Sequence, residues 1–140
     1  MTHSIYTCLW FSIPANEAAA YYCSVFKNSR LLQANPLVAN FEINSTHIMA
    51  LSGNEHQPFT SATSLVVPCN NQDEIDYYWN ALGEGGAWGQ CGWLTDKWGV
   101  SWQIIPARLG EWMQDPAKRQ RVMTALLQMN KLEIEPLMNA

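Results

Sequence analysis

Apolar and polar residues alternate along the chain with two periodicities, one typical of strands and one typical of helices. Residues 5–11 are an apolar and aromatic run that predicts a strand. A helix is expected next, because Asn16 can cap it and apolar residues then recur at helical spacing, at Ala18 or Ala19, Tyr22, Val25 and Phe26. Residues 31–39 contain a proline and predict at best an irregular or edge strand. Residues 40–43 and 47–51 predict two further strands.

The same order of elements returns after the polar segment 53–58. Residues 63–67 predict a strand, and residues 71–82 predict a helix. Asn71 is a suitable N-cap with a glutamate three residues later, and Gly83 is a suitable C-terminal stop. The second half of the chain therefore begins, like the first, with a strand followed by a helix.

A β-hairpin is predicted to complete the second half. Its strands are residues 88–95 and 100–105, and the link between them ends at Gly99, which can take the positive φ that closes a hairpin. Because strand side chains alternate, Gln103 lies on the face opposite Trp102. We expect this strand to be central and its amide to be buried among apolar neighbours. A buried amide needs hydrogen-bond partners, and either a ligand or the protein itself can supply them.

Similar residues recur 56 positions apart, as the pairs Leu9-Trp10-Phe11 with Leu65-Val66-Val67 and Tyr21-Tyr22 with Tyr77-Tyr78 show. Such coincidences are common among aromatic and aliphatic residues, so the spacing alone leaves a repeat open. Together with the order of elements it favours two similar modules, at residues 5–52 and 60–106, within a single domain of residues 1–140.

A helix outside the repeat is predicted for residues 115–131. Asp115-Pro116 provides a cap and a good first helical residue, and an apolar stripe follows at Val122, Met123, Leu126, Leu127 and Met129. Lys118, Arg119 and Arg121 then form its solvated face. The apolar stripe must pack on the protein's own sheet or on a second subunit, and we expect a homodimer that uses this helix.

Composition restricts the possible partners. The chain has 140 residues, of which 48% are hydrophobic and 14% charged, and a net charge of −4, so no basic stripe is available to bind nucleic acid. No apolar run approaches the roughly 18 to 20 residues of a membrane span, and no signal-peptide pattern is present, so we expect a cytoplasmic protein without membrane partners. The four cysteines include no CxxC pair, which favours reduced thiols over disulfides or a zinc site.

The hairpin carries a resemblance to a known family. Gly-Gln-Cys-Gly-Trp-Leu at 89–94, Asp-Lys-Trp-Gly at 96–99 and Ser-Trp-Gln-Ile at 101–104 resemble the closing hairpin of the PhnB-like family. That family is often labelled 3-demethylubiquinone-9 3-methyltransferase and belongs to the glyoxalase/bleomycin-resistance (vicinal oxygen chelate) superfamily. The resemblance extends over residues 5–132. It implies an α+β fold of paired βαβββ modules, whose sheets curl around a shared cavity, with an added C-terminal helix.

The resemblance also implies where functional residues should lie. Superfamily enzymes bind a divalent metal through His and Glu side chains, but here Gln103 stands in the position of the last ligand and Ser64 where a histidine is common. The corresponding candidates in the first and fourth strands are Ile5 or Thr7, and Met49. An amide, a hydroxyl and a thioether lack the charge that offsets a metal ion's lost hydration, so we expect neither a metal nor another cofactor.

Two further residues complete the predicted ligand-binding set of Thr7, Met49, His56, Ser64, Cys91 and Gln103. His56 is the best placed of the three histidines, because this loop resembles a family loop with a histidine there. Cys91 lies between glycines, but no basic residue beside it would lower its pKa, so a small apolar filler is favoured over a nucleophile. The glycines at 83–86 follow a helix, which predicts a turn instead of a cofactor-binding loop.

Three functions are compatible with these residues. The first is a metal-independent protein that binds a small molecule, as bleomycin-resistance proteins do. The second is a superfamily enzyme, such as an isomerase, lyase or dioxygenase-like protein, with an altered metal site. The third is the methyltransferase of the family label, for which the sequence contains no recognisable cofactor motif. The first is favoured because the expected metal ligands are absent from the positions that the resemblance assigns to them.

Overall fold

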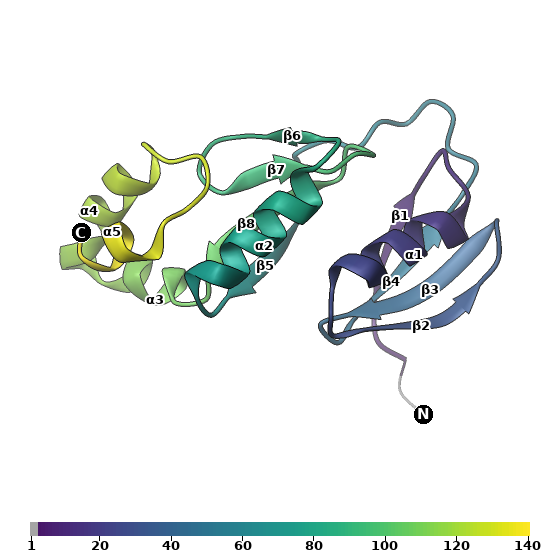
Figure 1. Ribbon diagram of the computed structural model, residues 1–140, viewed down its shortest axis with the longest axis horizontal. Helices are drawn as coiled ribbons and strands as arrows, with labels where there is room; N and C mark the ends of the chain where they lie inside the picture. The colour runs from purple at the N-terminus through teal and green to yellow at the C-terminus, as the bar shows by residue number, and fades with distance from the viewer. Residues whose placement is uncertain (1–2) are drawn as a thin grey trace. The chain divides into compact units, whose positions relative to one another are not determined.

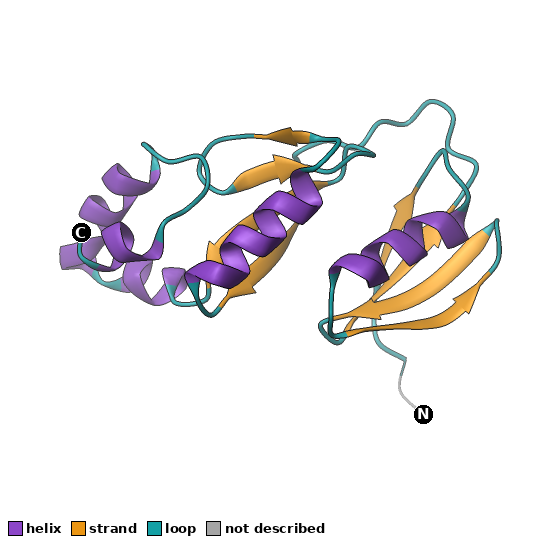
Figure 2. Ribbon diagram, viewed as in Figure 1, coloured by secondary structure: helices purple, strands orange, loops and turns teal. Residues whose placement is uncertain are grey.

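The computed structural model describes residues 3–140. The chain divides into two compact units, Met1–Gln57 and Pro58–Ala140, and each contains one four-stranded sheet. Figure 2 shows one long helix lying across each sheet. No helix in residues 3–140 is long and apolar enough to span a bilayer.

The first unit is a βαβββ module (Figure 1). Its elements are β1 (Thr7–Trp10), α1 (Ala15–Val25), β2 (Ser29–Ala34), β3 (Val38–Ile43) and β4 (Thr46–Leu51). The strand order is β1-β4-β3-β2, with β1 parallel to β4 and the other pairs antiparallel. The ambiguous segment 31–39 contains the end of edge strand β2, whose register is irregular between Leu31 and Gln33, and the start of β3.

One face of the first sheet packs on α1. The predicted apolar positions of the helix are buried, and the ring of Tyr22 stacks on Phe41 of β3 with 6.0 Å between ring centroids. The predicted N-cap was wrong by two residues, since Pro14 occupies that position and no side chain caps the helix. Proline's restricted φ suits a helix start, so the chain turns into the helix before Asn16.

The second unit repeats this topology. Its elements are β5 (Ser64–Cys69), α2 (Gln72–Gly83), β6 (Ala87–Trp88), β7 (Trp93–Thr95) and β8 (Ser101–Pro106), in the sheet order β5-β8-β7-β6. As predicted, the side chain of Asn71 caps α2 by accepting a hydrogen bond from the Glu74 N–H at 2.9 Å. Both units have the predicted βαβββ order, which confirms the α+β fold class, and the hairpin strand β8 lies inside its sheet.

The 56-residue spacing aligns the first strands of the two units, since Leu9 of β1 and Leu65 of β5 both lie on the helix side of their sheets, but it does not align the helices. Tyr22 is buried on α1, whereas Tyr78 is half-buried and the buried aromatic residue of α2 is Trp79. The matched tyrosine pairs are therefore displaced by one position relative to the surfaces that pack on the two sheets.

The predicted strand 88–95 is two strands. Between β6 and β7 the chain turns at Gly89–Gly92, where Cys91 has φ 60° and Gly92 has φ 83°. The backbone N–H groups of these two residues donate to the carbonyls of Met129 and Asn130, both at 2.8 Å. In a continuous strand these N–H groups would donate to a neighbouring strand of the sheet, whereas here they donate to a segment that is distant in sequence.

The C-terminal region contains three helices instead of one: α3 (Leu109–Gln114), α4 (Pro116–Leu126) and α5 (Ile134–Met138). They gather at one end of the second unit (Figure 1). The predicted Asp115 cap is present, with the Ala117 N–H donating to its carboxylate at 3.0 Å, but α4 ends at Leu126 and Leu127 is exposed. The buried residues of this region are Trp112, Val122, Leu132 and Leu137. Because Val122 is buried within its own unit, a second subunit is not required to cover it.

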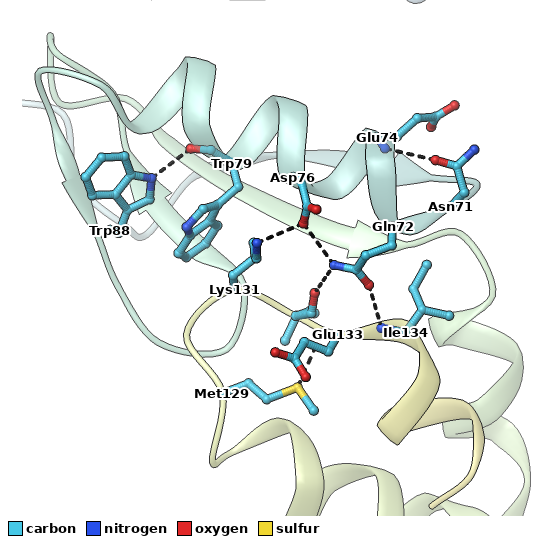
Figure 3. Close-up of polar contacts among 11 residues, drawn as sticks. Asn71, Gln72, Glu74, Asp76, Trp79, Trp88, Met129, Lys131, Glu133 and Ile134 are labelled. Atoms are coloured by element: carbon cyan, nitrogen blue, oxygen red, sulfur yellow. Dashed lines mark hydrogen bonds and ion pairs between the residues drawn. The ribbon is translucent and has the colours of Figure 1, made fainter.

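Residues 131–134 are attached to α2, as Figure 3 shows. The Gln72 amide donates to the Leu132 carbonyl at 3.0 Å and accepts from the Ile134 N–H at 2.9 Å. Lys131 forms an ion pair with Asp76 at 2.9 Å, which holds the pKa of that carboxyl below its ordinary value. A polar helix face is thereby used to hold the C-terminal segment.

Candidate functional site

The second sheet has a face directed away from α2, which we call its open face. Val67, Leu94, Trp102 and Ile104 are buried on the α2 side. Alternation along each strand places the other residues on the open face: Ser64, Val66, Pro68, Ala87, Trp93, Thr95, Ser101, Gln103 and Ile105. Val66 is 50% exposed, so the second unit itself does not cover this face there.

Gln103 and Ser64 form a polar pair on the open face. The Gln103 Nε2 donates a hydrogen bond to the Ser64 Oγ at 3.0 Å, and both residues are half-buried. The residues described by the structure give the amide oxygen and the second N–H of Gln103 no other partner. Because the serine hydroxyl can donate or accept, either orientation of the amide leaves a donor and an acceptor for a ligand.

Buried Asp96 sets the direction of Gln103 through the hairpin turn. One carboxylate oxygen accepts from the N–H groups of Trp98 and Val100, at 3.0 and 3.1 Å, and the other accepts from the Trp102 indole at 3.0 Å. Gly99 has φ 91°, as the turn requires. With Trp102 held on the α2 side, Gln103 must lie on the open face. The sequence signal for this role is an aspartate at the start of the hairpin link, which can accept from turn N–H groups.

The Gln103–Ser64 pair does not fit a divalent metal ion. Both side chains are neutral, and each already shares a hydrogen bond with the other. Residues 3–140 include no group of three or more His, Cys, Asp or Glu side chains placed to hold a metal. Zinc, iron and manganese sites need anionic or imidazole ligands to offset the lost hydration of the ion.

The candidate residues of the first sheet lie on opposite faces. Thr7 pairs with Ile48, which is buried on the α1 side, whereas Met49 pairs with Cys8 on the other side. The structure therefore separates Thr7 from Met49 and puts Cys8 where Thr7 was expected. Burial raises the pKa of the Cys8 thiol, so it is protonated at neutral pH and is a poor nucleophile.

A polar group that the sequence pattern did not predict lies on the same face of the first sheet as Met49. The Nε2 of His47 lies 2.9 Å from the Asn40 Oδ1, and the Tyr6 ring stacks on the imidazole with 4.0 Å between centroids. Arg30 and Glu42 form an ion pair at 3.1 Å. The sequence does show polar residues alternating with apolar ones along β3. Which polar residues of the other strands lie beside them becomes known only from the strand pairing.

His56 and Cys91 lie apart from strand faces. His56 is in the loop after β4 with 86% of its side chain exposed, 3.8 Å from the Glu55 carboxylate. Cys91 is half-buried in the β6–β7 turn, where its backbone is bonded to Met129. The structure therefore brings together Ser64 and Gln103 out of the six predicted residues.

The glycines at 83–86 allow close packing. A Cβ on Gly83 would lie 2.0 Å from the Trp88 indole nitrogen, and one on Gly86 would lie 2.1 Å from the Thr95 carbonyl oxygen. The segment begins with the last residue of α2 and does not precede a helix, so its N–H groups do not form the helix N-terminus that binds phosphate in dinucleotide sites.

A groove of 970 Å³ lies elsewhere in the second unit, between the start of α2 and the C-terminal segment. It contains none of the predicted site residues and is lined by Asn70, Asn71, Gln72, Asp76, Lys131, Glu133, Ile134, Glu135, Pro136, Met138 and Asn139. Gln72, Asp76 and Lys131 bond one another or the backbone. These polar groups therefore serve mainly to attach the C-terminal segment.

The model of one protein family matches residues 3–105, and that family is described as 3-demethylubiquinone-9 3-methyltransferase. Among solved structures, a putative 3-demethylubiquinone-9 3-methyltransferase of Bacillus cereus, a PhnB protein, is 30% identical with a TM-score of 0.67, over 74% of this chain and 99% of that protein. The Pseudomonas aeruginosa protein PA1353 is 19% identical with a TM-score of 0.64, over 75% of this chain and 98% of that one.

A fosfomycin resistance protein, FosX of Listeria monocytogenes, shares the fold at 15% identity. Its structure, in complex with Mn(II) and a sulfate ion, gives a TM-score of 0.62 over 81% of this chain and 97% of FosX. No curated protein matches the chain.

Proposed function

We propose that this chain, which belongs to the family described as 3-demethylubiquinone-9 3-methyltransferase, is a metal-independent small-molecule binding protein. Its fold is that of the glyoxalase/bleomycin-resistance superfamily. The ligand lies on the open face of the second sheet and is bound by Gln103 and Ser64. The proposal differs from the chemistry of the Mn(II)-bound FosX neighbour, because Gln103 and Ser64 cannot supply a metal with negative charge.

The observation that supports the proposal is that the Gln103 side chain has a hydrogen-bond donor and an acceptor that its bond to Ser64 does not use. Gln103 lies between Val66 of β5 and Trp93 of β7, so an amide with a donor and an acceptor to spare is flanked by apolar side chains. Small-molecule sites commonly combine an apolar surface with a few placed polar groups.

Gln103→Leu tests the proposal because it removes the amide at similar volume. A thermal-shift screen against metabolites first identifies a ligand. Affinity for that ligand should then fall by about 1 to 3 kcal/mol, roughly 5- to 150-fold, while folding stability changes little. Gln120→Leu is the matched control, because the same substitution is made at an exposed position of α4. A variant that loses stability and binds normally would make Gln103 a structural residue.

Two measurements separate the proposal from the enzyme alternatives. Elemental analysis after metal-free purification should find no stoichiometric metal, and one zinc, iron, manganese or nickel ion per chain would favour a superfamily enzyme with an altered site. Calorimetry should detect no tight binding of S-adenosylmethionine, because the 83–86 glycines are used for packing. Micromolar binding with methyl transfer to a demethylated quinone would establish the methyltransferase instead.

A further inference from the structure

The open face of the second sheet carries no ionisable side chain. Its residues are one amide, three hydroxyls and apolar groups: Gln103, Ser64, Thr95, Ser101, Val66, Pro68, Ala87, Trp93 and Ile105. The corresponding face of the first sheet is different, since Arg30, Glu42 and His47 lie on it. Neutrality is therefore a property of this sheet face and not of every sheet in the chain.

This difference affects the charge of a ligand that can bind. A carboxylate or phosphate moved from water onto the open face would lose hydration without meeting a cation, and an ammonium group would lose it without meeting an anion. A neutral carbonyl or hydroxyl loses less hydration and can regain hydrogen bonds from the Gln103–Ser64 pair. The charge inventory thus favours an uncharged ligand.

The apolar residues around the pair indicate the rest of the ligand. Ile105, two residues along β8 from Gln103, packs against the buried cluster of the C-terminal region. Trp93 and Val66 are the direct cross-strand neighbours of Gln103, one on each side. A molecule that contacts these side chains while reaching Gln103 must present apolar surface on both sides of its polar group. Aromatic rings and conjugated systems have this form, and they pack favourably on a tryptophan.

We propose that the open face of the second sheet selects an uncharged molecule with an apolar, ring-like body and a carbonyl or hydroxyl group that bonds Gln103 and Ser64. This selectivity rests on the proposed function, because it specifies the ligand class of the same site. The neutral surface excludes phosphates, phosphonates and carboxylates by their desolvation cost, without a side chain that repels them.

Ligand-observed fluorine NMR on the full chain tests the charge rule with defined probes. The panel consists of fluorinated benzamides and naphthamides, each compared with its matched carboxylate. The neutral amides should bind at least tenfold more tightly than their carboxylates, and Gln103→Leu should reduce amide binding at least fivefold. Val66→Lys adds a cation at a half-exposed position and should improve carboxylate binding severalfold. The difference in affinity between each amide and its carboxylate should therefore become smaller.

The outcomes distinguish this inference from the function on which it rests. Carboxylates that bind as tightly as amides, and are weakened by Gln103→Leu, would leave the site in place and overturn its neutral selectivity. Amide binding that neither Gln103→Leu nor Val66→Lys alters would show that the probes bind elsewhere and would overturn both. Failure of every probe to bind would overturn the proposed ligand class, and the thermal-shift screen would then decide separately whether the face binds another small molecule.

Discussion

Replacing Gly83 by alanine should destabilise the second unit through a steric conflict with Trp88. Gly83 is the last residue of α2, and the Trp88 indole lies against it while its N–H donates to the Trp79 carbonyl at 2.7 Å. An alanine Cβ would lie 2.0 Å from the indole nitrogen and 2.5 Å from the adjacent ring carbon. These distances are far below van der Waals contact, so the ring must move.

Three terms set the size of the effect. Overpacking typically costs about 1 to 3 kcal/mol, and loss of the indole hydrogen bond adds about 0.5 to 1.5 kcal/mol. Alanine's better helix propensity returns up to about 1 kcal/mol. Trp88 is 52% exposed and can swing outward, which relieves part of the strain at the expense of the hydrogen bond. We therefore expect a net loss of about 1 to 2 kcal/mol, near the lower end of the combined range.

Urea unfolding followed by circular dichroism measures this loss, and two variants control it. Gly110→Ala places the same methyl group in α3 where no atom lies within 4 Å, and it should leave stability unchanged or raise it. In a Trp88→Ala background, Gly83→Ala should no longer destabilise the protein, since the ring is absent. An equal loss in both backgrounds, or a Gly83→Ala protein as stable as wild type, would refute the steric explanation.

Three other predictions concern turn chemistry, pH and assembly. Asp96→Asn should lower the free energy of unfolding in urea by about 1 to 3 kcal/mol. The amide oxygen can replace only one carboxylate oxygen, so the amide N–H₂ must face one of the groups that now donate to Asp96. An unchanged urea midpoint would contradict this. Burial raises the pKa of the Cys69 thiol to about 12, from an ordinary value of 9.0, so the unfolded chain ionises first and the free energy of unfolding should fall as the pH rises from about 9 to about 12. In equilibrium unfolding measured across this pH range, the free energy of unfolding of Cys69→Ala should fall less than that of the wild type. The same pH dependence in both proteins would show that the thiol is not responsible. Light scattering should reveal a homodimer. Because Val122 is buried within its unit, the exposed Leu127, which directly follows α4, is the residue to change, and an unaltered dimer in Leu127→Asp would exclude the C-terminal end of α4 from the interface.

The sequence alone was sufficient where neighbouring residues determine the conformation. The Asn71 side chain caps a helix that begins one residue later, and the turn from Asp96 to Gly99 joins two strands in the predicted hairpin. The placement of Gln103 opposite Trp102 follows from that turn and from strand alternation, both of which act over a few residues. The strongest candidate for ligand binding was therefore accessible from local pattern, together with the family resemblance carried by the same hairpin.

Only the tertiary structure decided the features that depend on distant partners. Nothing near Thr7 specifies its face, which follows from its pairing with Ile48 on a strand about forty residues later. Carbonyls of Met129 and Asn130 bond the turn that divides the expected strand 88–95. Gln72 appears in the sequence as an ordinary helix residue, yet it binds the backbone on both sides of Glu133. Hydrogen bonds and strand register join residues by position in space, and a periodic pattern of apolar residues contains no information about which distant backbone groups will meet.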